Sequence, residues 1–130
     1  MDNFNNRIQN TVATKNYNGD GDTLVFHASV RGQVRRVRLV HSAASVGNVT
    51  ANHLVFQLVH LSGTTETNIG DAYSTEANAA AKGDIVEIVN FDSARLELEQ
   101  GDSLLINATE TGTATAQFAV AVDFEVIGSD

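Results

Sequence analysis

The chain has 130 residues, of which 42% are hydrophobic and 18% charged, and its formal net charge at pH 7 is −8. This length fits one domain, and no apolar run approaches the ~18–20 residues of a membrane helix. The acidic balance argues against nucleic-acid binding, and the absence of cysteine excludes disulfide and thiolate chemistry. We therefore expect one globular domain with neither a nucleic-acid nor a membrane partner.

Residues 1–22 are polar and rich in asparagine, with Phe4 and Ile8 among their few apolar side chains. They contain no apolar segment of the kind that a secretion signal needs. We predict an extended N-terminal arm that either frays or lies along a partner. The turn signal NGDGD at 18–22 ends this arm, and a β-sandwich domain is predicted over 23–130.

From residue 23 onward, short apolar runs alternate with turn residues, which is typical of β-structure. The predicted strands cover residues 23–30, 33–42, 53–62, 64–73, 84–91, 94–100, 102–109 and 113–127. About eight strands at this spacing favour an antiparallel sandwich or barrel. Only residues 74–84 have helix chemistry, because a cap (Ser74 or Thr75) precedes several alanines and Gly83 follows them. We expect an all-β fold with at most one short helix.

Alternation along the strands predicts which side chains face the interior. The predicted core contains Leu24, Phe26, Val37, Leu39, Leu54, Phe56, Leu58, Ile88, Leu96, Leu98, Leu104, Ile106, Phe118, Val120, Val122 and Phe124. Alanines alternate with these residues along the last strand, so its other face would allow another surface to approach closely.

The segment RGQVRRVRLVH, residues 31–41, holds four of the chain's eight basic residues, namely Arg31, Arg35, Arg36 and Arg38. Val34 and Val37 are an odd number of residues apart, so a regular strand would place them on opposite faces. We predict a β-bulge at Arg35–Arg36 that keeps both valines inward and the arginines outward.

Three partners for these outward arginines are considered. The first is the chain's own carboxylates, in particular Glu97 and Glu99 on the polar face of residues 94–100, within one chain or between subunits. The second is an acidic surface of a partner protein. The third is nucleic acid, which is disfavoured because no aromatic side chain interleaves the arginines for base stacking.

The chemistry-bearing residues form no motif that predicts catalysis, a metal or a cofactor. Residues 16–21 match the first half of a calcium loop, but the position of its bidentate glutamate is occupied by His27. Glu97 and Glu99 share a face and could imitate a glycosidase pair. A glycosidase cleft is usually lined by aromatics, and this chain has no tryptophan and only two tyrosines. We expect no enzyme.

The segment RLELEQGDSLLINATETGTATAQFAVAVDFEVI resembles the closing half of jelly-roll domains in virion proteins of tailed bacteriophages. The shared features are an amphipathic strand, a hairpin turn (here residues 99–104) and a final strand of alternating Val, Phe and Ala. The composition, free of Pro and Cys and rich in Asn, Thr and Ala, and the polar arm are similar to those of capsid decoration (cement) proteins.

This resemblance implies a jelly-roll protein of the phage capsid surface, made in the cytoplasm of the bacterial host and commonly trimeric. Such a protein binds the major capsid protein and bridges its subunits, and it brings no catalytic residue or cofactor. Our candidate contacts are Phe4 and Ile8 of the arm and the four arginines at positions 31, 35, 36 and 38. The alternative is a receptor- or carbohydrate-binding jelly roll, such as a fibre tip, with Tyr73 and the loop 43–52 as contributors.

Overall fold

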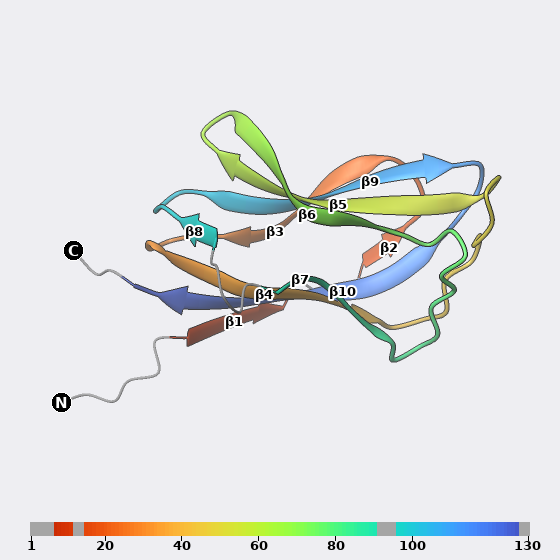
Figure 1. Ribbon diagram of the computed structural model, residues 1–130, viewed down its shortest axis with the longest axis horizontal. Coiled ribbons are helices and arrows are strands. Elements are labelled where there is room, and N and C mark those ends of the chain that lie inside the picture. Colours follow the sequence, from red (N-terminus) through yellow and green to blue (C-terminus); the bar gives the residue numbers. More distant parts are fainter. Residues whose placement is uncertain (1–6, 12–14, 91–95, 128–130) are drawn as a thin grey trace.

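The computed structural model describes residues 7–11, 15–90 and 96–127, which form ten β-strands and no helix. The strands are β1 (Arg7–Thr11), β2 (Lys15–Tyr17), β3 (Gly21–His27), β4 (Gly32–His41), β5 (His53–Ser62), β6 (Thr65–Ser74), β7 (Ile85–Asn90), β8 (Leu96–Leu98), β9 (Ser103–Thr111) and β10 (Ala116–Val126). They form two antiparallel sheets that pack face to face (Figure 1). The predicted β-sandwich is confirmed.

The two sheets differ in size, and the chain crosses between them repeatedly. Sheet A has the order β1-β10-β4-β7, with β2 also pairing with β10 and β8 with β4, whereas sheet B has the order β3-β9-β5-β6. The segment predicted as an arm contributes β1 and β2, which pair with β10 of the same chain. The backbone of Ile8 lies opposite Phe124, and Phe4 lies outside the described residues.

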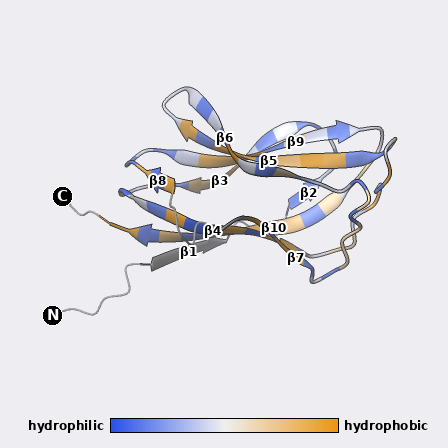
Figure 2. Ribbon diagram, in the orientation of Figure 1, coloured by the Kyte–Doolittle hydropathy of each residue, from blue (hydrophilic) through white to orange (hydrophobic). Residues whose placement is uncertain are grey.

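Side chains from both sheets fill the interior, and several aromatic rings gather in a cluster around Tyr17, while Phe26 and Phe124 form a separate pair at 4.8 Å. Tyr17 stacks on Phe118 with ring centroids 4.6 Å apart and meets Phe56 edge-on at 5.1 Å. Tyr17 is 4% exposed although it belongs to the predicted arm, because β2 pairs with the start of β10 beside the core. Figure 2 shows that β5, inside sheet B, is strongly apolar.

Most of the predicted core is confirmed. Ile88 and Leu96 are only partly buried against it. The prediction that Leu24 belongs to the core is wrong, because this residue is 55% exposed. The cause is a register shift in β3, where Leu24 lies opposite Leu105 and Phe26 opposite Leu104, so that the intervening Val25 has no opposite residue.

The bulge predicted in the arginine strand is confirmed. Val34 lies opposite Phe124 and Arg36 opposite Asp123, which leaves Arg35 as the extra residue in β4. Val34 and Val37 are both fully buried. The bulge therefore reconciles two inward valines with outward arginines on the same strand.

The helix predicted over 74–84 is absent. Ala77 has a φ of 59°, which is incompatible with a right-handed helix. The Thr75 hydroxyl accepts a hydrogen bond from the N–H of Leu54 and donates one to the carbonyl of Gly47, so it ties the segment to its neighbours instead of capping a helix. A two-turn helix is marginal by itself, and these tertiary bonds override the local preference for helix.

The turn predicted at residues 99–104 is present, but it does not join the strands of a hairpin. The N–H of Asp102 donates to the carbonyl of Glu99 at 3.0 Å, and Gly101 adopts a φ of 95° that glycine tolerates best. The preceding strand β8 pairs with β4 in sheet A, while the following strand β9 belongs to sheet B. This turn therefore carries the chain from one sheet to the other.

The described residues include no helix of the length and hydrophobicity that a membrane span would need.

Candidate functional site: the arginine strand and the polar clusters

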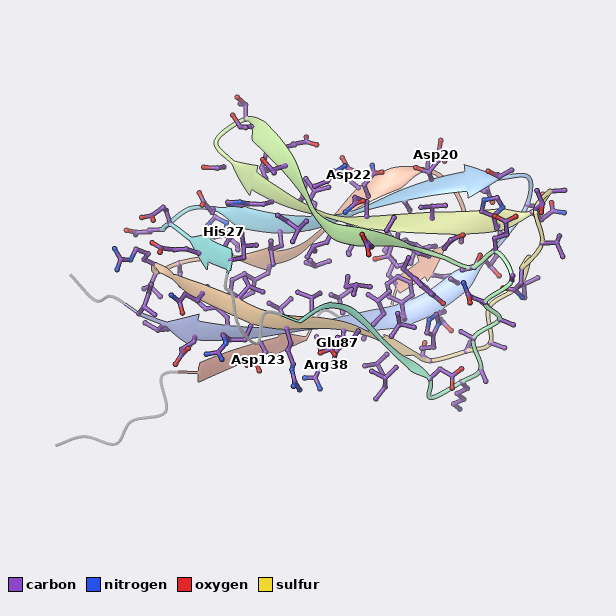
Figure 3. The ribbon with its side chains drawn as sticks, viewed as in Figure 1. Asp20, Asp22, His27, Arg38, Glu87 and Asp123 are labelled. Carbon is purple, nitrogen blue, oxygen red and sulfur yellow. The ribbon has the colours of Figure 1, made fainter. Side chains whose placement is uncertain are left out.

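The arginines of β4 lie on the outer face of sheet A, where carboxylates of neighbouring strands meet them. Figure 3 shows Arg38, Glu87 and Asp123 on the side of sheet A that points away from the interior. Within the described residues, the arginines form three ion pairs: Arg31, just before β4, with Glu97 at 3.6 Å, Arg35 with Glu125 at 2.8 Å, and Arg36 with Glu87 at 3.4 Å. The acidic residues come from β8, β10 and β7, each of which pairs with β4.

Of the three partners considered for the arginines, the chain's own carboxylates are the ones observed for Arg31, Arg35 and Arg36. Glu97 reaches Arg31 because β8 pairs with the start of β4, as the polar face of residues 94–100 suggested. Exposed pairs of this kind contribute only about 0–1 kcal/mol each. The Nε of Arg38 is buried and has no hydrogen-bond partner within the described residues.

A second polar cluster closes one end of the sandwich around Asp102. The side chain of Asp102 is nearly buried, and it accepts hydrogen bonds from His60 Nε2 at 2.9 Å and from the N–H of Glu99 at 3.0 Å. Burial alone would raise the pKa of Asp102, but the hydrogen bonds of His60, Glu99 and Ser62 lower it below its ordinary value. Asp102 thus fixes the crossover turn, and the sequence signal for it was the Gly-Asp step in that turn.

His27 and Ser103 form a neighbouring pair, with His27 Nδ1 and Ser103 Oγ 2.8 Å apart. This is the contact expected between a nucleophile and its base. The acid that would orient such a base is missing, because Asp102, next to Ser103, bonds His60 instead of His27. Within the described residues, the pair therefore does not form a catalytic triad.

His41 is the one histidine of the described residues that is buried without a hydrogen bond. It is 1% exposed, neither ring nitrogen has a partner, and its ring packs edge-on against Phe118 at 5.4 Å and Tyr73 at 6.1 Å. Burial lowers the pKa of His41, which the nearby Asp84 opposes only in part. Burial therefore favours the neutral form of the His41 ring.

The acidic residues Glu97 and Glu99, considered above as a glycosidase pair, are both exposed. Their interaction with each other raises the pKa of Glu99, and Glu97 forms an ion pair with Arg31 at 3.6 Å. One member of the pair is therefore engaged by an arginine of its own chain.

The half-motif of a calcium loop is used for internal hydrogen bonds. Asp20 accepts from the N–H of Glu110 at 2.7 Å, and Asp22 accepts from the Asn107 amide at 2.6 Å. In the part of the chain that the structure describes, no three His, Asp or Glu side chains converge as metal ligands. The shallow pocket beside residues 15–21 holds about 90 Å³, below the roughly 300–1,000 Å³ of small-molecule sites.

The two tyrosines pack in or against the core, Tyr17 buried and Tyr73 partly buried. Tyr17 is buried, and Tyr73 lies against Phe56 and His41, with ring centroids 6.2 and 6.1 Å away. Sugar-binding sites stack their ligand on exposed aromatic faces, so these residues do not favour the carbohydrate-binding alternative.

No protein-family model matches this chain, and a search of curated proteins finds none that matches it. The resemblance to phage decoration proteins therefore stays a prediction, as do the contacts assigned to Phe4, Ile8 and the four arginines.

Proposed function

We propose that this chain is a structural virion protein that decorates the head of a tailed bacteriophage by binding the major capsid protein. The observation that carries this proposal is the strand order. Sheets with the orders β1-β10-β4-β7 and β3-β9-β5-β6 support a jelly roll, in which eight main strands form two facing four-stranded sheets. Jelly rolls are recurrent in viral capsid proteins and also in lectins, so this step is an analogy of fold and composition.

The use of the polar side chains supports binding over catalysis. Asp102, His60, Ser103 and Thr75 are all engaged in hydrogen bonds that hold turns and strands together. The His27–Ser103 pair lacks an acid to orient it, because Asp102 bonds His60. A decoration protein needs a rigid body with outward surfaces, which these hydrogen bonds support. The mechanism we propose is multivalent attachment: an oligomer, expected to be a trimer, contacts several capsid subunits at once, so that weak contacts add up.

The test is binding to heads of the phage that encodes this chain, assembled without its gene. Purified protein is added to expanded heads, and the copies bound per head are counted by sedimentation and cryo-electron microscopy. We expect saturable binding at symmetry-related positions and greater resistance of the heads to heat. A folded protein that leaves the heads bare, or one that binds glycans on an array, would contradict this function.

A further inference from the structure

The bulge in β3 turns one large apolar side chain out of the core and onto the outer face of sheet B. Val25 and Phe26 are both buried, at 1% and 7% exposure, so Leu24 points the other way and is 55% exposed. A single exposed leucine is common on protein surfaces, so its meaning depends on the side chains beside it.

Leu24 belongs to an apolar row that crosses three strands of sheet B. Leu24 lies opposite Leu105 of β9, and Leu105 lies opposite Val59 of β5. Val59 is 4% exposed yet does not belong to the core cluster, so its neighbours on the outer face cover it. The row continues diagonally to Leu61, whose cross-strand partner on β6 is Glu66.

Carboxylates flank this row on both sides, and the strands of sheet B supply no lysine or arginine to pair with them. Asp22 precedes Leu24 by two residues on β3, and Figure 3 shows it on the side of sheet B that faces away from the interior. Glu66 flanks the other side, and both are exposed. Strands β3, β5, β6 and β9 contain no lysine or arginine, and neither carboxylate forms an ion pair within the described residues. Lys15 of β2, which reaches Thr23, does not pair with Asp22.

We propose that the outer face of sheet B is the docking face, and that its occupant is a protein surface presenting apolar side chains flanked by lysine or arginine. The partner's chemistry follows from complementarity. Its apolar side chains would cover the apolar row of sheet B, and its lysines or arginines would pair with Asp22 and Glu66, which have no cationic partner in their own chain within the described residues. A second copy of sheet B would bring Asp22 and Glu66 against like charges, which opposes self-association through this face. The inference rests on the proposed function, under which the occupant is the outer surface of the capsid protein.

This assignment differs from the arginine face that the sequence suggested. Arg31, Arg35 and Arg36 already have carboxylate partners in their own chain, so docking an acidic surface there would first break or share those pairs. On the outer face of sheet B, Asp22 accepts a hydrogen bond from the Asn107 amide, but within the described residues neither Asp22 nor Glu66 has a cation to give up.

The experiment measures binding of four variants to heads assembled without this protein. Leu24→Lys and the double variant Asp22→Lys/Glu66→Lys alter sheet B. Ile85→Lys is a matched control, because Ile85 is 61% exposed and lies opposite Val40 in sheet A, and Arg36→Glu is the charge control. Circular dichroism and thermal unfolding first verify that each variant is folded.

We expect each sheet B variant to weaken head binding by about tenfold or more, as central interface positions do, and each control to change it less than about threefold. Higher salt should weaken the wild type and have less effect on the double variant. Loss of binding in the controls with the sheet B variants unchanged would overturn the inference and leave the proposed function standing. Failure of the wild type to bind would defeat the proposed function itself. A wild-type dimer in solution that Leu24→Lys dissociates would overturn the inference by identifying a second copy as the occupant.

Discussion

The outer faces of the two sheets use charge in opposite ways. On sheet A, Arg31, Arg35 and Arg36 meet Glu97, Glu125 and Glu87 of their own chain. On sheet B, Asp22 and Glu66 flank an apolar row and have no cation on their own strands. The contrast teaches that a cluster of one charge in a sequence does not identify a binding surface, because the fold can supply its counter-ions. The surface left incomplete is the better candidate.

Among the histidines that face the interior, the contrast is reversed: the one on sheet A lacks a polar partner and the one on sheet B has one. Sheet A buries His41 with no hydrogen-bond partner, whereas sheet B pairs His60 with Asp102. The four predictions that follow probe this inside–outside contrast, from the largest expected effect to the smallest.

We expect the largest loss of stability at Leu104 and a much smaller one at Leu24, two leucines of sheet B that point in opposite directions. Leu104 is fully buried and Leu24 is exposed. Leu104→Ala should lower the free energy of unfolding by about 2–5 kcal/mol through lost burial and a cavity, whereas Leu24→Ala should cost less than about 1 kcal/mol. Urea unfolding of both variants measures this difference, and equal losses would mean that Leu24 belongs to the core after all.

Removing Asp102 should give the next largest loss. Asp102→Ala leaves His60 and the Glu99 N–H without their acceptor, which should cost about 2–3 kcal/mol. Because the pKa of Asp102 is lowered in the folded state, its contribution is present above the unfolded pKa of about 3.8 and is lost as the pH falls through the lower folded pKa. Wild-type and variant stabilities measured from pH 6 to pH 2 should therefore converge in acid; a constant difference would contradict this role.

His41 should make the protein sensitive to mild acid. Its pKa is lower in the folded than in the unfolded state, so the unfolded chain binds more protons once the pH falls below about 6.5. The free energy of unfolding should then drop by up to about 1.4 kcal/mol per pH unit until the folded pKa is reached. His41→Phe, beside Phe118 and Tyr73, should remove this slope, and an unchanged slope in the variant would assign it to another group.

The ion pairs of sheet A should have the smallest effect. Arg35 and Glu125 are the closest pair and the more shielded one, so a double-mutant cycle with alanine should give a coupling of about 0.5–1 kcal/mol. The more exposed Arg36–Glu87 pair should give about 0–0.5 kcal/mol. These values should fall in 1 M salt; a larger coupling for the exposed pair would reverse the ranking inferred from burial.

Strand alternation was enough to predict the β-sandwich, most of its core and the bulge at Arg35. It failed at Leu24 because three consecutive apolar residues, Leu24 to Phe26, are compatible with either face until β9 fixes the register. The prediction of a helix over 74–84 failed because tertiary contacts determine the conformation of this segment. The Thr75 hydroxyl forms hydrogen bonds with β5 and with the loop before it.

The candidate site was less accessible to sequence reasoning than the fold. The arginines were found by composition, but their counter-ions come from three other strands, and only Glu97 was anticipated. The apolar row of sheet B required pairing between residues 46 and 81 positions apart, which no local pattern in the chain contains. The same register error that misplaced Leu24 concealed this face.

The most direct test of the contrast between the two faces is carboxylate footprinting of the protein free and bound to heads, with carbodiimide labelling read by mass spectrometry. We predict that labelling of Asp22 and Glu66 falls strongly on binding, while labelling of Glu87 and Glu125 stays at its level in the free protein. Protection of Glu87 and Glu125 with Asp22 and Glu66 still reactive would contradict the assignment and return the docking surface to the arginine strand.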